Sequence, residues 1–164
     1  MKDWLSLQHE MATYYPPASF YFTVKFSGIN TAEDASFSEV SGLEAERPVV
    51  EIKEGGENRF SYRVPDRGRY DNLVLKRGLL VWTSELAVWC RHTIESDLGN
   101  PVMTRGIDIV LLDLDAAPLM VWSVKDARPV KWSVSALAAD KNEIAVETLE
   151  LAFSSFSRNS QPAG

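Results

Sequence analysis

Hydrophobic and polar residues alternate along much of the chain. At its start, Phe20, Phe22, Val24 and Phe26 are separated by Tyr21, Thr23 and Lys25. A period of two is typical of a β-strand with one face buried and one face in water. The stretch Gly28-Ile29-Asn30 then ends this first predicted strand.

Further extended segments follow, each bounded by turn signals. In chain order they are ASFSEVSGLEAE, VVEIK, RFSYRV, NLVLKRGLLV, GIDIVLLDL, LMVWSVKDA and VKWSVSAL. We expect a bend at Gly42, a strand end at Pro48 and a turn at DLDAAP. Pro129 is expected to separate the last two strands, because proline cannot donate a hydrogen bond to a sheet.

The double glycine in EGGEN lies between two of these strands. A strand, a short glycine-containing connection and a second strand predict a hairpin, because glycine adopts the positive φ of a tight reversal. A phosphate-binding glycine loop would instead open a helix and carry the GxxxxGK[ST] spacing. Neither feature surrounds Gly55-Gly56, so the hairpin is favoured.

One helix is predicted, over TSELAVWCRHTIES. Thr83 or Ser84 can cap its first N–H groups, and Glu85 lies at its positive end. The residues Leu86, Trp89, Cys90, Thr93 and Ile94 fall on one stripe that we expect to pack on a sheet.

The segment NEIAVETLELAFSSF fits two structures. Ile144, Val146, Leu149 and Phe153 suit a helical stripe, whereas residues 147–151 alternate between apolar and polar. A long strand is favoured because the neighbouring segments are strands.

The chain is expected to form one domain over residues 18–157, preceded by an N-terminal extension of residues 1–17 and followed by a loose tail of residues 158–164. The predicted fold is mainly β, an antiparallel sandwich or barrel with one packed helix.

Composition and charge narrow the classes of partner. The net charge of −6 gives no general attraction to nucleic acid or to an anionic membrane. Cys90 is the one cysteine, so no internal disulfide is expected, and the chain contains neither a secretory signal pattern nor a run of 18 apolar residues. These features predict a protein made in the cytoplasm, without stable membrane insertion.

Candidate catalytic groups are poorly placed. Cys90 and His92, two apart on a helix, point to nearly opposite sides. Asp108, Asp113 and Asp115 could suggest a cation site, but no calcium-loop glycine surrounds them, and a solvated strand face with a turn is favoured. One cysteine and two histidines make a poor zinc ligand set. We therefore expect no catalytic residues, no metal site and no cofactor.

Two adjacent strands carry apolar residues on both faces. This holds for IVLLDL and LMVW, so both faces should contact protein. A single helix covers only part of that surface. The sheets must therefore form a sandwich, or other subunits must cover the remainder.

Four segments together resemble one protein family. FSEVSGLEAERPVVEIKEGGENRF, YDNLVLKRGLL, PLMVWSVKDARPVKWSVSAL and IAVETLELAF, in this order, are similar to the tail tube proteins of contractile phages and phage-derived injection systems. The resemblance covers Tyr15 to Arg158. YYPPASFYFTVKF, EGGENRF and WCRHTIES look most like the variant that initiates the inner tube on the central spike.

The resemblance implies a homohexameric ring around a β-barrel lumen. Rings would stack into a tube, and the spike, sheath and baseplate proteins would be its partners. The whole assembly would be a phage tail-like particle that is released from the cell or acts outside it. It also implies that the hairpin contacts neighbouring subunits, through Glu51, Lys53, Glu54, Gly55, Gly56, Glu57, Asn58, Arg59 and Tyr62. The alternatives are a main shaft subunit and a small β-sandwich baseplate adaptor or binding module.

Overall fold

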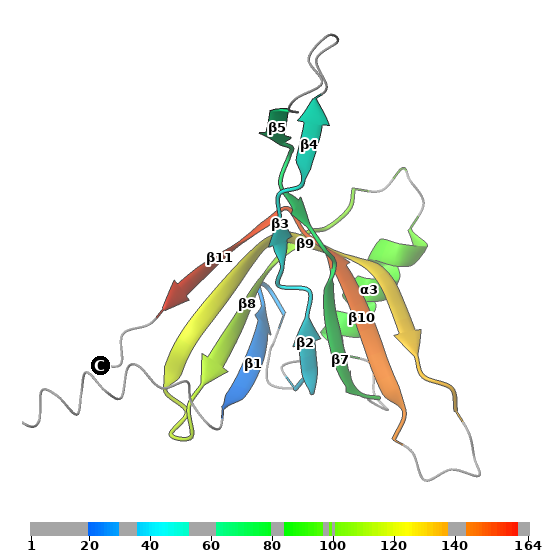
Figure 1. Ribbon diagram of the computed structural model, residues 1–164. Coiled ribbons are helices and arrows are strands. Elements are labelled where there is room, and N and C mark those ends of the chain that lie inside the picture. Colours follow the sequence, from blue (N-terminus) through cyan, green and yellow to red (C-terminus); the bar gives the residue numbers. More distant parts are fainter. Residues whose placement is uncertain are drawn as a thin grey trace, which may run out of the picture.

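The protein is built mainly from antiparallel strands (Figure 1). The computed structural model describes residues 20–29, 36–52, 62–79, 84–96, 99, 101–137 and 144–160. Its elements are β1 (Tyr21–Phe26), β2 (Glu39–Ser41), β3 (Ala45–Glu46), β4 (Val49–Ile52), β5 (Tyr62–Pro65), β6 (Arg69–Tyr70), β7 (Leu73–Gly78), α3 (Glu85–Glu95), β8 (Arg105–Leu112), β9 (Pro118–Val134), β10 (Val146–Ala152) and β11 (Ser155–Ser160). The predicted mainly β, antiparallel fold with one packed helix is confirmed.

The long strand β9 belongs to two layers of the body. Its first half pairs with β8 on one side and β11 on the other, and β1 extends this layer beyond β8; we call it sheet A. Its second half pairs with β10, followed by β7 and β2; we call this layer sheet B. One buried cluster takes Val24, Ile107 and Val124 from sheet A and Leu75 and Leu149 from sheet B.

Two irregularities mark the middle of β9. The register with β8 shifts between Val124 and Ala127, where Asp126 has a φ of 54°, and the register with β10 shifts between Pro129 and Lys131. The prediction that Pro129 separates two strands is therefore wrong. Pro129 lies opposite Leu151 at a bulge, where the ladder is already irregular and a missing N–H group interrupts little.

The predicted helix is confirmed as α3. The Ser84 hydroxyl accepts a hydrogen bond from the Ala87 N–H at 3.1 Å and so caps the first turn. Leu86, Trp89 and Cys90 are buried. The prediction that Ile94 belongs to the buried face is wrong, because its side chain is 41% exposed. The buried face of α3 is therefore narrower than expected.

The C-terminal segment consists of two strands. β10 and β11 confirm that the ambiguous stretch is extended rather than helical, but the expected single long strand is wrong, because β10 ends at Ala152 and β11 begins at Ser155. The prediction of a loose tail from residue 158 onward is wrong for residues 158–160, because β11 pairs with β9 as far as Ser160. Residues 1–17 and 161–164 lie outside the described residues, and the domain bounds of 18–157 stay a prediction.

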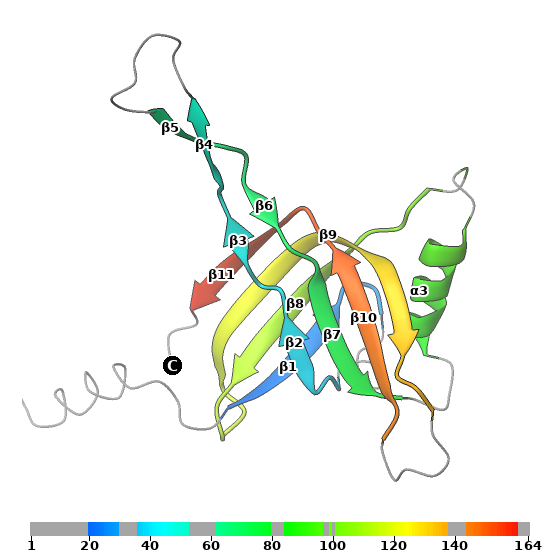
Figure 2. The ribbon, with the colours of Figure 1, turned by 45° about the vertical axis from the view of Figure 1, so that its right-hand side comes forward.

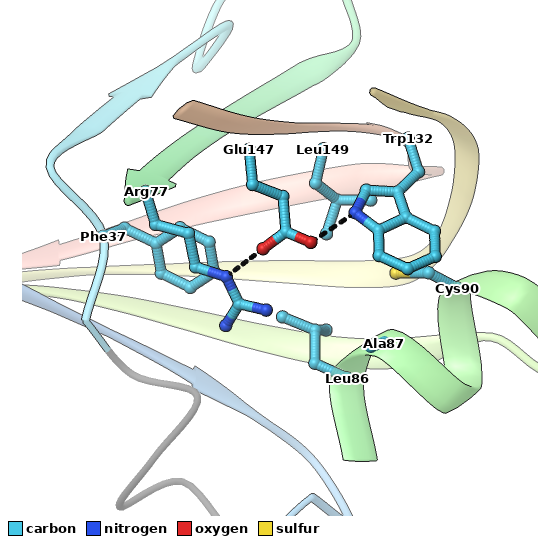
Figure 3. Close-up of a pocket in the computed structure, with 8 residues that line it drawn as sticks. All are labelled: Phe37, Arg77, Leu86, Ala87, Cys90, Trp132, Glu147 and Leu149. Atoms are coloured by element: carbon cyan, nitrogen blue, oxygen red, sulfur yellow. Dashed lines mark hydrogen bonds and ion pairs between the residues drawn. The ribbon is translucent and has the colours of Figure 1, made fainter. Parts of the chain in front are cut away.

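A buried charge pair joins β7 to β10 (Figure 3). Arg77 Nε donates to Glu147 Oε2, and Trp132 Nε1 donates to Glu147 Oε1 at 2.6 Å. The side chains of Arg77 and Glu147 are 5% and 6% exposed. The Arg77 guanidinium also lies 5.5 Å from the centre of the Phe37 ring. Because a buried charge without its partner is costly, this network favours one register of β10 against β7.

Removing one member of the pair should destabilise the fold strongly. We expect Glu147→Leu to lower the free energy of unfolding by about 3–5 kcal/mol, because Arg77 and Trp132 both lose the buried carboxylate that accepts their hydrogen bonds. Urea unfolding followed by tryptophan fluorescence measures this loss. The double variant Arg77→Met/Glu147→Leu should recover much of it.

Glu150→Leu is the matched control. Glu150 lies on the same strand, but its ion-pair partner Lys131 is 61% exposed at the side chain, so we expect a change within about 1 kcal/mol. An equal loss of unfolding free energy in Glu147→Leu and Glu150→Leu would contradict the importance of the buried pair.

Candidate assembly surface

A two-stranded arm projects from the body (Figures 1 and 2). Its base is the pairing of β3 with β6, and its outer part is the antiparallel pairing of β4 with β5. We call residues 45–52 and 62–70 the arm. The two strands predicted on either side of Gly55-Gly56 are therefore confirmed, while the connection at residues 53–61 lies outside the described part of the chain.

Apolar side chains are exposed on both faces of the arm. The exposed fractions are 47% for Val49, 49% for Val50, 50% for Ile52 and 43% for Val64. Val50 lies opposite Val64 with Ile52 on the same face, whereas Val49 belongs to the other face. An isolated two-stranded ribbon is marginally stable in water, so these side chains favour a partner that covers the arm.

Gly42 positions the arm where it leaves β2. Its φ is +88°, a left-handed conformation that glycine adopts easily. A Cβ atom at this position would lie 2.0 Å from the Asn72 carbonyl oxygen. The sequence prediction of a bend at Gly42 is confirmed, and the close approach to Asn72 leaves no room for a side chain.

Three aromatic rings hold the base of the arm against the body. Tyr70 of β6 lies 5.4 Å from Phe153 and 5.7 Å from Phe156, measured between ring centres. Phe153 and Phe156 are 6.1 Å apart with an interplanar angle of 68°. The contacts of Phe156 with Tyr70 and with Phe153 are edge-to-face, a geometry that favours a defined orientation, so the direction of the arm is coupled to the corner between β10 and β11.

The predicted interface residues are only partly described. Glu51 is exposed and lies opposite Arg63, and Tyr62 lies opposite Ile52. Lys53, Glu54, Gly55, Gly56, Glu57, Asn58 and Arg59 lie outside the described residues, and their contact role stays a prediction.

The sequence did not single out Val49, Val50, Ile52 and Val64, which the structure exposes on the arm. The adjacent valines Val49-Val50 were an available signal, because neighbouring apolar residues on a strand point to opposite faces.

The polar residues considered as catalytic candidates have other surroundings. Cys90 is 1% exposed in the core, whereas His92 is exposed on α3. Asp113 Oδ1 accepts from the N–H groups of Asp115 and Ala117 at 2.9 and 2.8 Å, which shapes the turn between β8 and β9. Asp108 Oδ1 accepts from Ser123 Oγ at 2.7 Å across the strand pair.

Two hollows lie beside α3. The smaller one, next to Glu147 and Trp132, has a volume of about 10 Å³, which is room for roughly one water molecule (Figure 3). The open one, about 520 Å³, is lined by residues that include Val88, Trp89 and Arg105. Arg105 Nη1 donates to the Ser27 carbonyl at 2.7 Å and Trp89 Nε1 to the Met103 carbonyl at 2.9 Å, so these groups already serve the fold.

The helix of the described residues is too short and polar to cross a membrane. Within the same residues, no group of three or more histidine, cysteine, aspartate or glutamate side chains is arranged to hold a metal ion.

Comparison with known families gives one match over most of the chain. Residues 18–157 match the model of the T4-like virus tail tube protein gp19. No curated protein sequence matches the chain.

Solved structures show the same fold in contractile injection systems. A chain of the anti-feeding prophage baseplate is 26% identical, with a TM-score of 0.71 over 89% of this chain and 97% of that chain. A chain of the PVC sheath/tube terminator is also 26% identical, with a TM-score of 0.71 over 89% and 98%. A chain of the PVC sheath-tube complex is 24% identical, with a TM-score of 0.75 over 93% and 97%.

Substituting Gly42 should disturb the arm. We expect Gly42→Ala to lower the free energy of unfolding by at least ~1–2 kcal/mol, because the left-handed backbone alone costs that much for alanine, and the clash with Asn72 adds to it. Chemical unfolding measures the loss. Gly68→Ala is the control, since its Cβ would lie 3.9 Å from the nearest atom, the Glu46 carbonyl oxygen. An equally large loss of unfolding free energy in Gly68→Ala would contradict the special role of Gly42.

Proposed function

The chain belongs to the family of the T4-like virus tail tube protein gp19, and we propose that it forms rings of the inner tube of a contractile injection system. Its role is structural: the tube transmits force and encloses a passage. The matches to chains of baseplate, tube and terminator complexes support this family role.

The observation that carries the proposal is the exposed apolar surface of the arm. Full burial of a valine or isoleucine side chain stabilises by about 1.5–3 kcal/mol. Covering Val49, Val50, Ile52 and Val64, each about half exposed, would therefore contribute several kcal/mol per subunit. In a ring, the neighbouring copy is the partner that every arm meets.

The edges of sheet B support ring closure. In the described part of the chain, β2 pairs only with β7, and the second half of β9 pairs only with β10. Each of these edges has backbone groups that a neighbouring strand could bond. Six copies joined through such edges would form a hexameric ring with a continuous β-barrel lumen, and rings would stack into the tube.

Within the tube, we place the chain in the initiating ring, between the spike and baseplate below and the shaft above. The likeness to a chain of the anti-feeding prophage baseplate supports this position. The likeness to a chain of the PVC sheath-tube complex favours the second candidate, a shaft subunit surrounded by sheath. The rings would assemble in the cytoplasm and become part of a phage tail-like particle.

Electron microscopy of the purified protein, alone and mixed with its spike protein, separates these roles. Sixfold rings that form only with the spike support the initiator, whereas long tubes formed without it support the shaft subunit. A monomer under both conditions, checked by light scattering, would overturn the tube proposal and favour a baseplate adaptor.

A charge placed on the arm should prevent assembly without unfolding the subunit. We expect Val50→Asp to abolish rings or tubes in negative-stain images, because a carboxylate would have to be buried against the neighbour. The melting temperature of the isolated subunit should change little, because Val50 is already 49% exposed.

Val88→Asp is the matched control for this substitution. Val88 is 46% exposed on α3, away from the arm, so this variant should assemble in the absence of sheath. Normal assembly of Val50→Asp would contradict the contact role of the arm.

A further inference from the structure

One end of sheet A carries apolar side chains on its outer face, the side away from the buried cluster. Because Val24 is fully buried, residues of the opposite parity on β1, such as Tyr21, point to the outer side. Tyr21 lies opposite Leu112 of β8, and in the next outward row Val110 of β8 lies opposite Val121 of β9. Tyr21 is 62% exposed and the other three are partly exposed. We call these four residues the apolar end of sheet A.

The rest of this outer face is polar. Its other outward residues in the same register are Thr23, Lys25, Asp108, Ser123, Ser157 and Asn159. The apolar end is therefore a bounded patch, three strands or about 10 Å across. Leu114, which is 68% exposed in the turn between β8 and β9, lies at the same end of the sheet.

The apolar end lies where residues 1–19 join the sheet. β1 begins and β8 ends at this end of sheet A, away from the arm (Figures 1 and 2). Phe20, directly before β1, is 56% exposed. The connection from Tyr15 to Phe20 can span about 17 Å when it is extended, which is long enough to lead the chain back over Tyr21.

Residues 1–17 contain an apolar pattern that the shared fold does not require. The family match begins at residue 18, so these residues precede the common domain. Trp4, Leu7, Met11 and Tyr14 follow one another at intervals of three, four and three residues. This spacing is typical of one side of a helix, over about 15 Å of its axis. The pattern offers an apolar strip about as wide as the patch, since a helix is about 10–12 Å in diameter.

We propose that residues 1–17 fold back over the apolar end of sheet A and cover it with Trp4, Leu7 and Met11. The occupant is the segment of the same chain because it is joined to the sheet at the patch itself. A short tether gives an effective concentration in the millimolar range, above that of a separate partner in dilute solution. The inference does not depend on the tube function, because it concerns the free subunit.

Thiol labelling of free subunits tests whether the segment covers this face. Val121→Cys places a thiol in the apolar end, and Thr148→Cys places one on the outward side of sheet B as the matched control, where the side chain is also partly exposed. The parent chain corrects for Cys90, which is 1% exposed. Each variant is compared with and without the triple substitution Trp4→Ser/Leu7→Ser/Met11→Ser.

The triple substitution should uncover the apolar end alone. We expect it to accelerate the reaction of Val121→Cys with a small maleimide about 10-fold, as for a face that was open about a tenth of the time. The rate at Thr148→Cys should change less than about twofold. The conservative set Trp4→Phe/Leu7→Met/Met11→Leu should keep Val121→Cys slow, because it preserves the apolar pattern.

Several labelling results would overturn the inference. One is an unchanged rate at Val121→Cys after the triple substitution. Another is an equal acceleration at Thr148→Cys, which would indicate a general loosening of the fold. Protection of Val121→Cys that appears only when the spike protein is added would assign the face to that protein instead.

Disulfide formation identifies the chain that covers the face. Val121→Cys is combined in turn with Leu7→Cys and Met11→Cys, and a bond requires the two Cα atoms to approach within about 7 Å. We expect at least one pair to form the bond within a single chain, at a rate independent of protein concentration. The same substitutions combined with Thr148→Cys should react about 10-fold more slowly, because the segment would leave its site to reach sheet B.

Bonded dimers on a non-reducing gel, with a rate that falls on dilution, would assign the face to a second copy and overturn the inference. Equal rates with Val121→Cys and Thr148→Cys would overturn it as well, because the segment would then have no preferred surface.

Discussion

The continuity of β9 through both sheets is the constraint on which the rest of the structure depends. A strand that pairs with β8 and β11 in its first half and with β10 in its second half sets the angle between two sheets within one backbone. The change occurs at the bulges around Asp126 and Pro129. Ser154 strengthens this corner, because its hydroxyl donates to Asp126 Oδ2 at 2.7 Å and its N–H to the Lys125 carbonyl at 3.0 Å.

The same corner determines where the candidate assembly surface lies. The chain turns from β10 into β11 next to Ser154, and Phe153 and Phe156 on either side of it hold Tyr70 at the base of the arm. The arm continues from β2 and β7, which are strands of sheet B. Its direction is thus coupled to this corner, which suits a subunit whose contacts must repeat identically around a ring.

The sequence predicted the local structure better than the long-range contacts. Alternation identified β1, extended apolar runs bounded by turn signals identified β7 and β8, and the glycine pair identified the strands of the arm, because each signal depends on neighbouring residues. Pro129 was misread, since its place at a bulge depends on the register of β10. The pair Arg77–Glu147 was not foreseen, because its partners are 70 residues apart and only the sheet brings them together.

The candidate surface could be predicted in its place but not in its residues. A hairpin between charged residues is visible in the sequence, and the resemblance to tail tube proteins gave it a role in contacts. Whether Val50 or Ile52 is covered by the body depends on the direction of the arm, which Gly42 and Tyr70 set through tertiary contacts. Exposure is therefore a property of the fold, and it became visible only in three dimensions.

The subunit carries two surfaces with opposite chemistry on one continuous β-structure. The arm exposes β-branched side chains whose burial against a partner would lower the free energy, whereas two outward charge pairs of sheet B, Lys76 with Glu39 and Lys131 with Glu150, are formed within the subunit. Alternation along β7 and β10 keeps these pairs out of the core, since each strand contributes one face to the core and the other to the outward side of sheet B.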